Sequence, residues 1–289
     1  MEPVVEVELR HLRAFVMVAE CGNFTRAAKG LFMTQPALSR IIRQLEALVG
    51  TQLLERSTRH VALTRTGQEF LIDVRSALTS VDQAVSKVRG RASIRLGFSW
   101  LLPDPWAQNV VRSFEERASA SVEFVSCPDP LEALRTALVD IAVLRGEPSI
   151  PAGDIRLIQL FSEDRIAVCS TASSLAEKGR VSWDDIARWP LVVNTMSGTT
   201  GPWSWPQGHG PERTVETTSF DEWIESVAAN RGIGIVPEVA ARRISHPTIK
   251  FIPIDNAPQI PVHLAFASRN AGALIRQFTE SALEAAAIT

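Results

Sequence analysis

The sequence predicts an α+β protein of several domains, in which a small helical domain is followed by a linker helix and a larger α/β domain. Three observations support this prediction. Two short helical patterns and two short strand patterns occupy residues 23–66. Apolar residues recur at alternating spacings of three and four over 71–88, as they do in one long helix with a heptad seam. From residue 94 onward, apolar strands alternate with helices, which is typical of α/β domains.

The composition favours a folded protein and disfavours several classes of function. The chain has 289 residues, of which 45% are hydrophobic, enough for a small domain and a larger one. It has neither an apolar run near the ~18 residues of a membrane helix nor a secretory signal pattern, so we expect a cytoplasmic protein without membrane contact. Cys21, Cys127 and Cys169 are too few and too dispersed for a disulfide framework. Metal-ligand spacings, nucleophile elbows and phosphate-binding loops are missing, so we expect no metal, no cofactor and no enzyme activity.

Charge is distributed unevenly along the chain. The net charge is −2, but residues 1–91 hold 13 Lys and Arg against 9 Asp and Glu, a balance of +4. Residues 92–289 hold the other 17 and 23, a balance of −6. Within 23–66, seven cations stand against two acids. Such a cluster is typical of a phosphate-binding surface, although a solvated basic face gives the same count.

The first two predicted helices precede a brief turn. Apolar residues over about 8–20 support a first helix, which Gly22 ends. Thr25 is then expected to cap a short helix that runs to about residue 31.

A third helix over 35–49 completes a helix-turn-helix pattern. Thr34 is its expected cap, and Pro36 costs little at an early helical position because its missing N–H would have lacked a partner there. One face of the helix is apolar. The other face presents amide, hydroxyl and guanidinium groups, which suit the major groove of DNA. These groups belong to Gln35, Ser39, Arg40 and Arg43.

Residues 52–64 are predicted to form a wing, which is a pair of short strands around a polar tip at 57–60. Arg56, Arg59 and Arg65 are expected to lie near backbone phosphates, which supply affinity but little sequence information.

A linker helix over 67–91 is predicted next, with Thr66 as its cap. Its heptad seam favours pairing with the same helix of a second copy, although a helix packed on its own domain would show the same spacing. We therefore predict a dimer. The seam residues are Leu71, Val74, Leu78, Val81, Val85 and Val88.

Five runs of residues occur in a characteristic order in the first seventy positions. They are Phe24-Thr25-Arg26-Ala27-Ala28, the run from Gln35 to Arg40, Arg43-Gln44-Leu45-Glu46, Leu53-Leu54-Glu55-Arg56 and Leu63-Thr64-Arg65-Thr66-Gly67. Together they resemble the N-terminal signature of LysR-type transcriptional regulators, over nearly all of residues 9–70. Leu54 stands where the family usually has Phe, and Gly30 should cost a helix about 1 kcal/mol relative to alanine. Neither departure touches the expected DNA-reading face.

The resemblance implies a winged helix-turn-helix DNA-binding domain over 1–66, a linker (dimerisation) helix over 67–91 and an effector-binding domain over 92–289. It implies that the third helix faces bases or nearby sugar-phosphate and that other cations meet phosphate. The family usually forms tetramers as two dimers that bend DNA. The DNA-binding residues expected here are Thr25, Arg26, Thr34, Gln35, Pro36, Ser39, Arg40, Arg43, Arg56, Arg59 and Arg65.

Strands and helices alternate through the C-terminal region, which predicts a mainly parallel sheet. Strands are predicted at 94–98, 122–125, 141–144, 155–161, 165–169, 190–194, 214–218, 233–236, 249–254 and 261–267. Helices are predicted at 105–117, 130–139, 182–188, 221–230, 237–243 and 272–286. The family resemblance implies a two-lobed α/β domain similar to periplasmic binding proteins. Lobe I would comprise about 93–165 and 267–289, and lobe II about 166–266.

The effector site is expected at the carboxyl ends of these strands, where open α/β sheets bind ligands. The loop at 194–201 is rich in hydroxyls and glycine and would suit an oxyanion, although an ordinary surface loop has the same composition. Arg145 would either supply a cation to an anionic ligand or pair with Glu147. The expected effector-binding residues are Ser99, Trp100, Cys127, Pro128, Arg145, Thr195, Ser197, Gly198, Thr199, Thr200, Thr218 and Ser219.

The predicted function is a sequence-specific transcriptional regulator that responds to a small molecule bound between the two lobes. Its expected partners are double-stranded promoter DNA with an inverted repeat, the effector, further copies of the chain, and RNA polymerase. Two alternatives stay open. Cys127 or Cys169 would permit a thiol-based redox-sensing regulator, since some family members sense peroxide through cysteines. The α/β domain alone would also suit a solute-binding component of a transporter, but the helix-turn-helix argues against that class.

Overall fold

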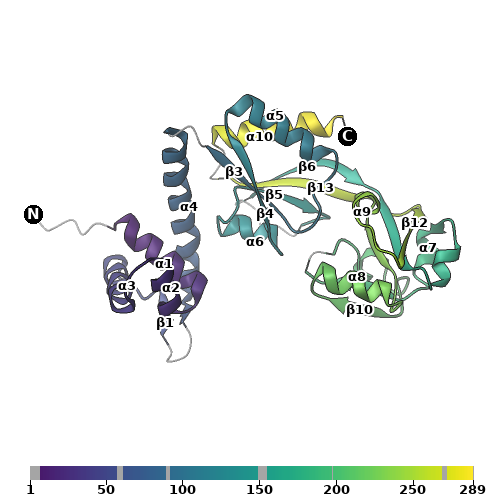
Figure 1. Ribbon diagram of the computed structural model, residues 1–289, viewed down its shortest axis with the longest axis horizontal. Helices are drawn as coiled ribbons and strands as arrows, with labels where there is room; N and C mark the ends of the chain where they lie inside the picture. The colour runs from purple at the N-terminus through teal and green to yellow at the C-terminus, as the bar shows by residue number, and fades with distance from the viewer. Residues whose placement is uncertain are drawn as a thin grey trace, which may run out of the picture. The chain divides into compact units, whose positions relative to one another are not determined.

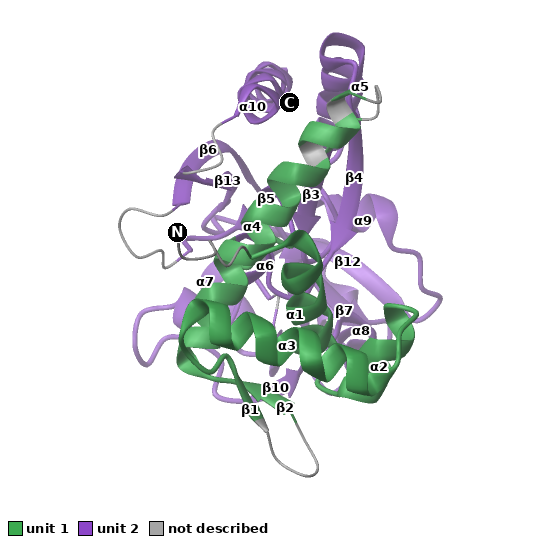
Figure 2. Ribbon diagram, turned by 90° about the vertical axis from the view of Figure 1, so that its left-hand side faces the viewer, with its two compact units in different colours: residues 1–93, 135–138 green, residues 94–134, 139–289 purple. Residues whose placement is uncertain are grey.

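In the computed structural model the chain divides into two compact units, which are described separately (Figure 2). One unit holds residues 1–93 and 135–138, and the other holds 94–134 and 139–289. The structure describes residues 7–56, 61–88, 92–148, 155–196, 198–268 and 272–288. The predicted wing tip with Arg59, the end of the linker at 89–91, and Ser197 lie outside these residues.

The N-terminal unit has the predicted order of elements (Figure 1). They are α1 (Leu9–Cys21), α2 (Phe24–Gly30), α3 (Gln35–Val49), β1 (Leu54–Arg56), β2 (Val61–Leu63) and α4 (Arg65–Val88). The two strands pair antiparallel, with Leu54 opposite Leu63. Gly67 lets the start of α4 approach the chain before β1, because a Cβ there would lie 2.0 Å from the carbonyl oxygen of Leu53. The unit is therefore a winged helix-turn-helix followed by one long helix.

Two helix caps differ from the sequence prediction. Asn23, rather than Thr25, caps α2, because its side-chain oxygen accepts hydrogen bonds from backbone N–H groups two and three residues along, at 2.9 and 3.0 Å. Thr64, rather than Thr66, supplies the hydroxyl at the start of α4 and accepts from the N–H of Gly67 at 2.9 Å. A cap must precede the N–H that it satisfies by two or three residues, so both helices begin earlier than expected.

A single apolar core joins α1, α3, the wing and α4. Phe15 of α1 and Leu38 of α3 are fully buried in it. Leu71 and Val74 of α4 are also buried here, with 8% and 2% of their surface exposed, and Leu78 packs against the same core. The first half of the predicted dimerisation seam is thus used inside its own unit, because α4 packs along α1.

The second half of the seam differs from the first. Val81 is half-buried, whereas Val85 is 43% exposed and Val88 is 90% exposed. These C-terminal turns of α4 are the part of the seam that is available to a partner helix.

The C-terminal unit is built on two larger sheets and one small one. The strand orders are β4-β3-β5-β13-β6, β11-β7-β12-β8 and β10-β9. Its strands are β3 (Ser93–Phe98), β4 (Ser121–Ser126), β5 (Ile141–Arg145), β6 (Ile155–Glu163), β7 (Arg165–Ser170), β8 (Val181–Ser182), β9 (Leu191–Asn194), β10 (Thr214–Thr217), β11 (Gly234–Pro237), β12 (Ile249–Asp255) and β13 (Ile260–Ala267). Its α-helices are α5 (Trp106–Ala118), α6 (Pro130–Arg135), α7 (Trp183–Ile186), α8 (Phe220–Ala228), α9 (Val239–Arg243) and α10 (Ala273–Ala286).

We call the part on the five-stranded sheet lobe I and the part on the other two sheets lobe II. The sheets are mixed rather than mainly parallel, which corrects the sequence prediction. β3 and β5 are parallel, but β13 is antiparallel to both β5 and β6, and β7 is antiparallel to β11 and β12. Parallel neighbours need a long crossover within one sheet. At residues 164 and 257, however, the chain leaves one sheet and enters the other without a helix, so no such crossover sets the direction of β7 or β13.

The strand pairing also corrects the predicted lobe boundary. The sequence assigned residues 166–266 to lobe II, but β13 lies between β5 and β6 in the sheet of lobe I. The chain therefore passes between the lobes at residues 163–165 and again at 255–260. These two crossings are tied together, because the side-chain amide of Gln259 donates to Asp164 at 2.9 Å. Among the described residues, no helix has the length and apolar character that crossing a bilayer requires.

Candidate DNA interface and effector cavity

The outer face of α3 is the candidate DNA-reading surface. Gln35, Pro36, Arg40 and Arg43 are exposed, and Ser39 is half-buried. On the opposite face Leu38, Ile42 and Leu45 are completely buried, which fixes the orientation of the helix on the unit. Thr34 caps the helix as predicted, accepting from a backbone N–H three residues along at 3.4 Å. A helix anchored from behind with polar groups in front has the form of a recognition helix.

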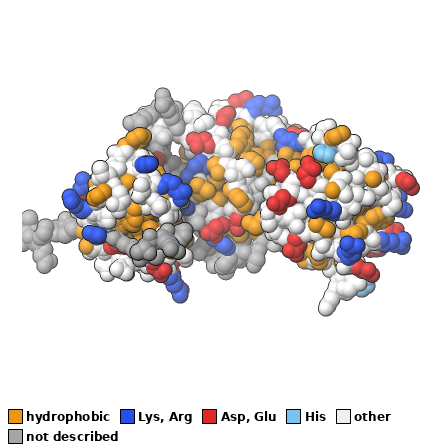
Figure 3. Space-filling model, turned by 60° about the horizontal axis from the view of Figure 1, so that its bottom comes forward, with side chains coloured by type: hydrophobic (Ala, Val, Ile, Leu, Met, Phe, Trp, Pro, Cys, Tyr) orange, Lys and Arg blue, Asp and Glu red, His pale blue; other side chains and the backbone are white. Residues whose placement is uncertain are grey.

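Other expected DNA-binding residues surround this helix, and they differ in how firmly contacts within the unit hold their side chains. Thr25 and Arg26 are exposed at the start of α2, and the guanidinium of Arg26 donates to the carbonyl of Cys21. Arg65 pairs with Glu69 one turn along at 3.3 Å, but both side chains are well exposed, so the pair holds Arg65 only weakly. Figure 3 shows cationic side chains spread over the N-terminal unit at its left. The side chain of Arg56 lies outside the described part of the chain.

Phe32 is a residue of this surface that the sequence analysis did not single out. It lies in the turn between α2 and α3, and its side chain is 99% exposed. Its backbone has φ of 54°, in the left-handed region that is unfavourable for an aromatic residue. The sequence could have pointed to Phe32, because the short turn between the two helices has no Gly or Asn to adopt a left-handed backbone.

The candidate effector site is a small cavity between lobe I and lobe II. Trp100, which follows the end of β3, lines the cavity from the side of lobe I. The lobe II side of the cavity combines apolar side chains with one amide, two hydroxyls and a glycine. These residues are Val192, Asn194, Gly198, Thr199, Thr200, Phe220, Trp223, Ile235, Val236 and Pro237. The free volume of the cavity is about 30 Å³.

The structure brings together only some of the expected effector-binding residues. Trp100, Gly198, Thr199 and Thr200 line this cavity, and Ser99 lines a larger groove beside it. The others do not line the cavity, either because they are used locally or because they lie elsewhere. Thr218 binds the carboxylate of Glu222, and the hydroxyl of Ser219 caps α8. The remaining residues outside the cavity are Cys127, Pro128, Arg145 and Thr195.

Arg145 has a different role from either that the sequence left open. It forms a bidentate ion pair with Glu163, at 2.6 and 3.1 Å, and both side chains are about nine-tenths buried. It also donates to the carbonyl of Leu101. The partner is Glu163 rather than Glu147, because β5 and β6 both flank β13 in the sheet of lobe I. Arg145 therefore supports the segment that carries Trp100 and is not a free cation for a ligand.

Arg165 is a second residue that the sequence analysis missed. It begins β7 at one lobe crossing, and its Nε donates to the carbonyl of Pro258 at the other crossing, at 2.7 Å. Its Nη1 donates to the carbonyl of Thr199, at 2.9 Å, and to the hydroxyl of Thr200. None of its hydrogen bonds within the described residues goes to a carboxylate, and burial lowers its pKa to about 10. Its contacts join the cavity loop to both crossings.

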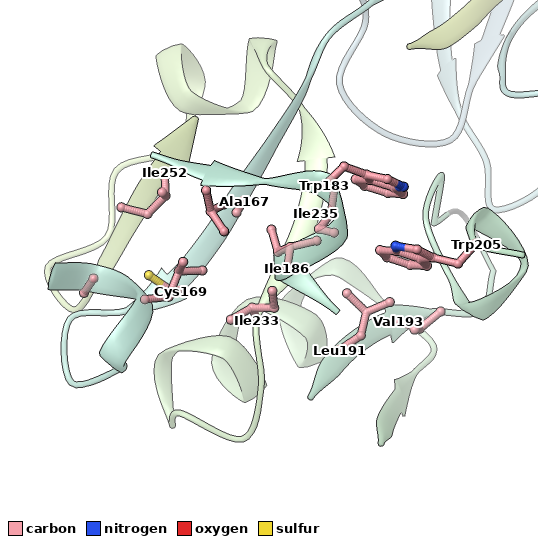
Figure 4. Packing of buried hydrophobic residues seen from close by; sticks show 13 residues of the cluster. Ala167, Cys169, Trp183, Ile186, Leu191, Val193, Trp205, Ile233, Ile235 and Ile252 are labelled. Atoms are coloured by element: carbon pink, nitrogen blue, oxygen red, sulfur yellow. The ribbon is translucent and has the colours of Figure 1, made fainter. Parts of the chain in front are cut away.

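A tryptophan pair supports Arg165 from within lobe II. The guanidinium carbon lies 5.7 Å from the ring centre of Trp183. Trp183 in turn stacks on Trp205, with centroids 4.3 Å apart and ring planes 2° apart (Figure 4). A cation over an aromatic face is stabilised by the ring quadrupole, which partly offsets the burial of this charge.

The two buried thiols show no feature of a reactive pair. Cys127 packs in lobe I and Cys169 in the core of lobe II, in separate apolar clusters. Burial raises the pKa of both thiols, and Asp129 raises that of Cys127 further. Reactive cysteines need a lowered pKa and access, so neither thiol has the setting of a redox sensor. Among the described residues, no group of His, Cys, Asp and Glu is placed to hold a metal ion.

The fold and these two sites define a DNA-binding regulator whose second domain has the two lobes of a ligand-binding module. Comparison with known proteins agrees. Residues 9–68 match the family model for bacterial regulatory helix-turn-helix proteins of the lysR family, and residues 89–287 match the LysR substrate binding domain. The chain belongs to the LysR family of transcriptional regulators, and its C-terminal unit is the effector-binding domain of that family.

Individual relatives extend over almost the whole chain. The Hca operon transcriptional activator HcaR of Escherichia coli (strain K12) is 28% identical over 94% of this chain and 96% of its own length. The crystal structure of full-length BenM is 27% identical, covers 98% of this chain and 97% of BenM, and has a TM-score of 0.56. Full-length CbnR, solved with its target DNA, has a TM-score of 0.65 at 21% identity, over 96% and 100% of the two chains, and shares the fold. HcaR is a transcriptional activator and CbnR a LysR family transcriptional regulator.

Proposed function

We propose that α3 lies in the major groove and that Gln35, Ser39 and Arg40 contact base edges. The observation that carries this proposal is the division of α3 into a buried apolar face and an exposed polar one. Arginine pairs with guanine and glutamine with adenine through two hydrogen bonds each, so these side chains suit base recognition. The sugar-phosphate contacts that we propose come from Thr25, Arg26, Thr34, Pro36, Arg43, Arg56, Arg59 and Arg65.

The chain acts, in this proposal, as a dimer joined by the exposed turns of α4, or as a tetramer of two such dimers. Two-fold symmetry then places two recognition helices on an inverted repeat. CbnR, a LysR family transcriptional regulator, is similar to this chain over 97% of this chain and 99% of its own length. A protein that regulates promoters acts in the cytoplasm with the chromosome, and that is the compartment we propose.

Effector binding in the cavity between the lobes is the proposed signal. Support comes from Trp100 of lobe I and Thr199 and Thr200 of lobe II, which line the same cavity. A molecule bound there favours one lobe arrangement only by its difference in affinity for the two arrangements. The resulting shift would alter the spacing of DNA-binding domains, and hence DNA bend or contact with RNA polymerase.

The Arg40→Ala variant tests the DNA-reading surface. If Arg40 contacts a base, its removal should weaken binding to the preferred site by about 1–3 kcal/mol and relax specificity at one position. The preferred site would first be selected from a random duplex library with the wild-type chain, and affinities then measured by fluorescence anisotropy. Arg117→Ala is the matched control, because it removes the same charge from an exposed pair with Glu284. An Arg40→Ala footprint and affinity equal to those of the control would contradict the proposal.

A further inference from the structure

We infer that Trp100 occupies the effector site of this structure as an internal ligand, and that the effector is a planar aromatic molecule that replaces its indole ring. The inference rests on the effector cavity proposed above. Trp100 belongs to lobe I, yet its side chain packs against the apolar cluster of lobe II that contains Val192 and Trp223. Its ring centre lies 5.1 Å from that of Phe220 on α8. A residue of one lobe therefore fills apolar space that belongs to the other.

The space left in this cavity is too small for a metabolite, whereas Trp100 and Phe220 also line the larger groove beside it. The free volume is about 30 Å³, whereas pockets for small molecules span roughly 300–1,000 Å³. Among the described residues that line the cavity, Trp100 alone comes from lobe I. Departure of this one side chain would therefore join the cavity to the larger groove, which Trp100 and Phe220 also line.

The chemistry of the walls defines the molecule that would take its place. The rings of Phe220 and Trp223 have centroids 5.7 Å apart and offer aromatic surface, to which a flat apolar molecule is complementary. The polar groups are the amide of Asn194 and the hydroxyls of Thr199 and Thr200. No Lys, Arg, Asp or Glu is found among the described residues that line the cavity. The favoured occupant is thus aromatic, of about the size of indole, with hydrogen-bonding groups at one edge and no required charge.

Displacement of Trp100 would change how the lobes are held together. The segment that follows it also contacts lobe II, because Arg243 donates to the carbonyl of Leu102 at 3.3 Å and Arg242 to that of Asp104 at 2.9 Å. Trp100 and Leu101 form the apolar part of this lobe contact. A ligand that replaces the ring of Trp100 removes the contribution of that side chain, and it must compete with a side chain whose local concentration is high. The apparent affinity equals the affinity of the open site multiplied by the fraction of molecules in which the site is open.

Removal of the side chain from the full-length protein tests the inference, with indole itself as the probe. Trp100→Ala should leave a vacant space of indole shape. We expect it to bind indole at least tenfold more tightly than the wild type by isothermal titration calorimetry, with a rise in thermal midpoint on addition of indole. Trp203→Ala is the matched control, because it removes a tryptophan of lobe II that is 66% exposed and does not line the cavity. This control should bind indole as the wild type does.

Equal indole binding by the wild type and by a Trp100→Ala variant with native circular dichroism would overturn the inference. If the alanine variant unfolds, Trp100→Val provides the test, since it keeps an apolar side chain at the site and still removes the ring. The space gained there should admit pyrrole or benzene more tightly than the wild type does, and unchanged affinity would contradict the inference.

The proposed effector cavity itself is tested by Thr199→Trp, which narrows it. A metabolite that alters the wild-type DNA footprint should fail to alter that of Thr199→Trp. If the metabolite still alters the footprint of Thr199→Trp, the effector does not bind in this cavity. If it is blocked while indole does not bind Trp100→Ala, the cavity stands and only the role of Trp100 fails.

Discussion

Phe32 shows how a single residue can be unfavourable for the fold at a place where binding is proposed. Its left-handed backbone costs about 1–2 kcal/mol for a residue with a Cβ, and its ring is almost fully in water. Burial of the ring does not offset this cost, because 99% of the side chain is exposed. The turn lies directly before α3, so we expect the ring to contact the sugar-phosphate backbone beside the proposed reading helix.

Replacement of Phe32 by asparagine should therefore stabilise the protein and weaken DNA binding. Asparagine tolerates the left-handed region, so we expect the free energy of unfolding to rise by about 0.5–1 kcal/mol in urea titrations. Phe124→Asn is the control, because Phe124 is 54% exposed on a strand with ordinary backbone and should give no gain. A loss of stability in Phe32→Asn, or unchanged affinity for the selected DNA site, would refute one or the other half of this prediction.

The buried thiols lead to a prediction with a defined pH dependence. The pKa of Cys127 and Cys169 is raised in the fold, so the unfolded chain loses these protons first as pH rises. The free energy of unfolding should then fall as pH increases from the ordinary thiol pKa towards the raised values, and be constant below that range. The double variant Cys127→Ala, Cys169→Ala should lack this slope in thermal melts.

Iodoacetamide labelling at pH 7.5 checks the same thiols in the folded state. Cys21 is partly exposed, and it should react at least tenfold faster than the two buried cysteines. Rapid labelling of Cys127 or Cys169 would revive the redox-sensing alternative.

Among the elements, α4 serves two purposes along its length. Its first half completes the core of the winged helix-turn-helix, and two ion pairs, Arg75 with Glu20 at 2.8 Å and Arg13 with Asp82 at 3.1 Å, join it to α1. Its last turns expose Val85 and Val88. The heptad pattern predicted the length and direction of the apolar stripe correctly, but spacing alone does not distinguish a stripe that faces its own domain from one that faces a partner.

A charge introduced at the exposed C-terminal end of the stripe tests the proposed dimer contact. Val85→Asp should raise the dissociation constant of the dimer at least tenfold in sedimentation equilibrium, because a charge enters an apolar helix pair. The helix content of the variant should stay that of the wild type. Ala84→Asp places the same charge on a neighbouring exposed position and should leave the dimer intact. A Val85→Asp protein that sediments like the wild type would show that the subunits associate through another surface.

At the scale of the whole molecule, local patterns predicted the elements, whereas the sites depend on contacts between distant residues. Helix and strand positions follow from periodicity and turn residues, so nearly all elements were predicted. The cavity is different, because it joins Trp100 to residues about a hundred positions away. A similar separation explains the misplacement of β13, whose neighbour β5 lies more than a hundred positions earlier. The unexpected partner of Arg145 is only 18 residues away, and it follows from the strand order, in which β5 and β6 flank β13. The family resemblance supplied the two lobes, but the side chains that meet between them follow from packing.

Arg165 connects the cavity to the two lobe crossings, and this connection is testable without an effector. Its guanidinium joins the loop at 199–200 to Pro258 at the second lobe crossing, and each hydrogen bond from a charged group contributes about 1.5–3 kcal/mol. In Arg165→Met, amides of residues 198–204 and 255–260 should exchange hydrogen at least tenfold faster, as mass spectrometry would show. Arg180→Met is the control, since Arg180 forms an exposed pair with Asp255 on the same lobe and should change exchange little. If the two variants exchange alike, the loop and the crossings are held by other contacts, and an occupied cavity must signal to the lobes through the segment that carries Trp100.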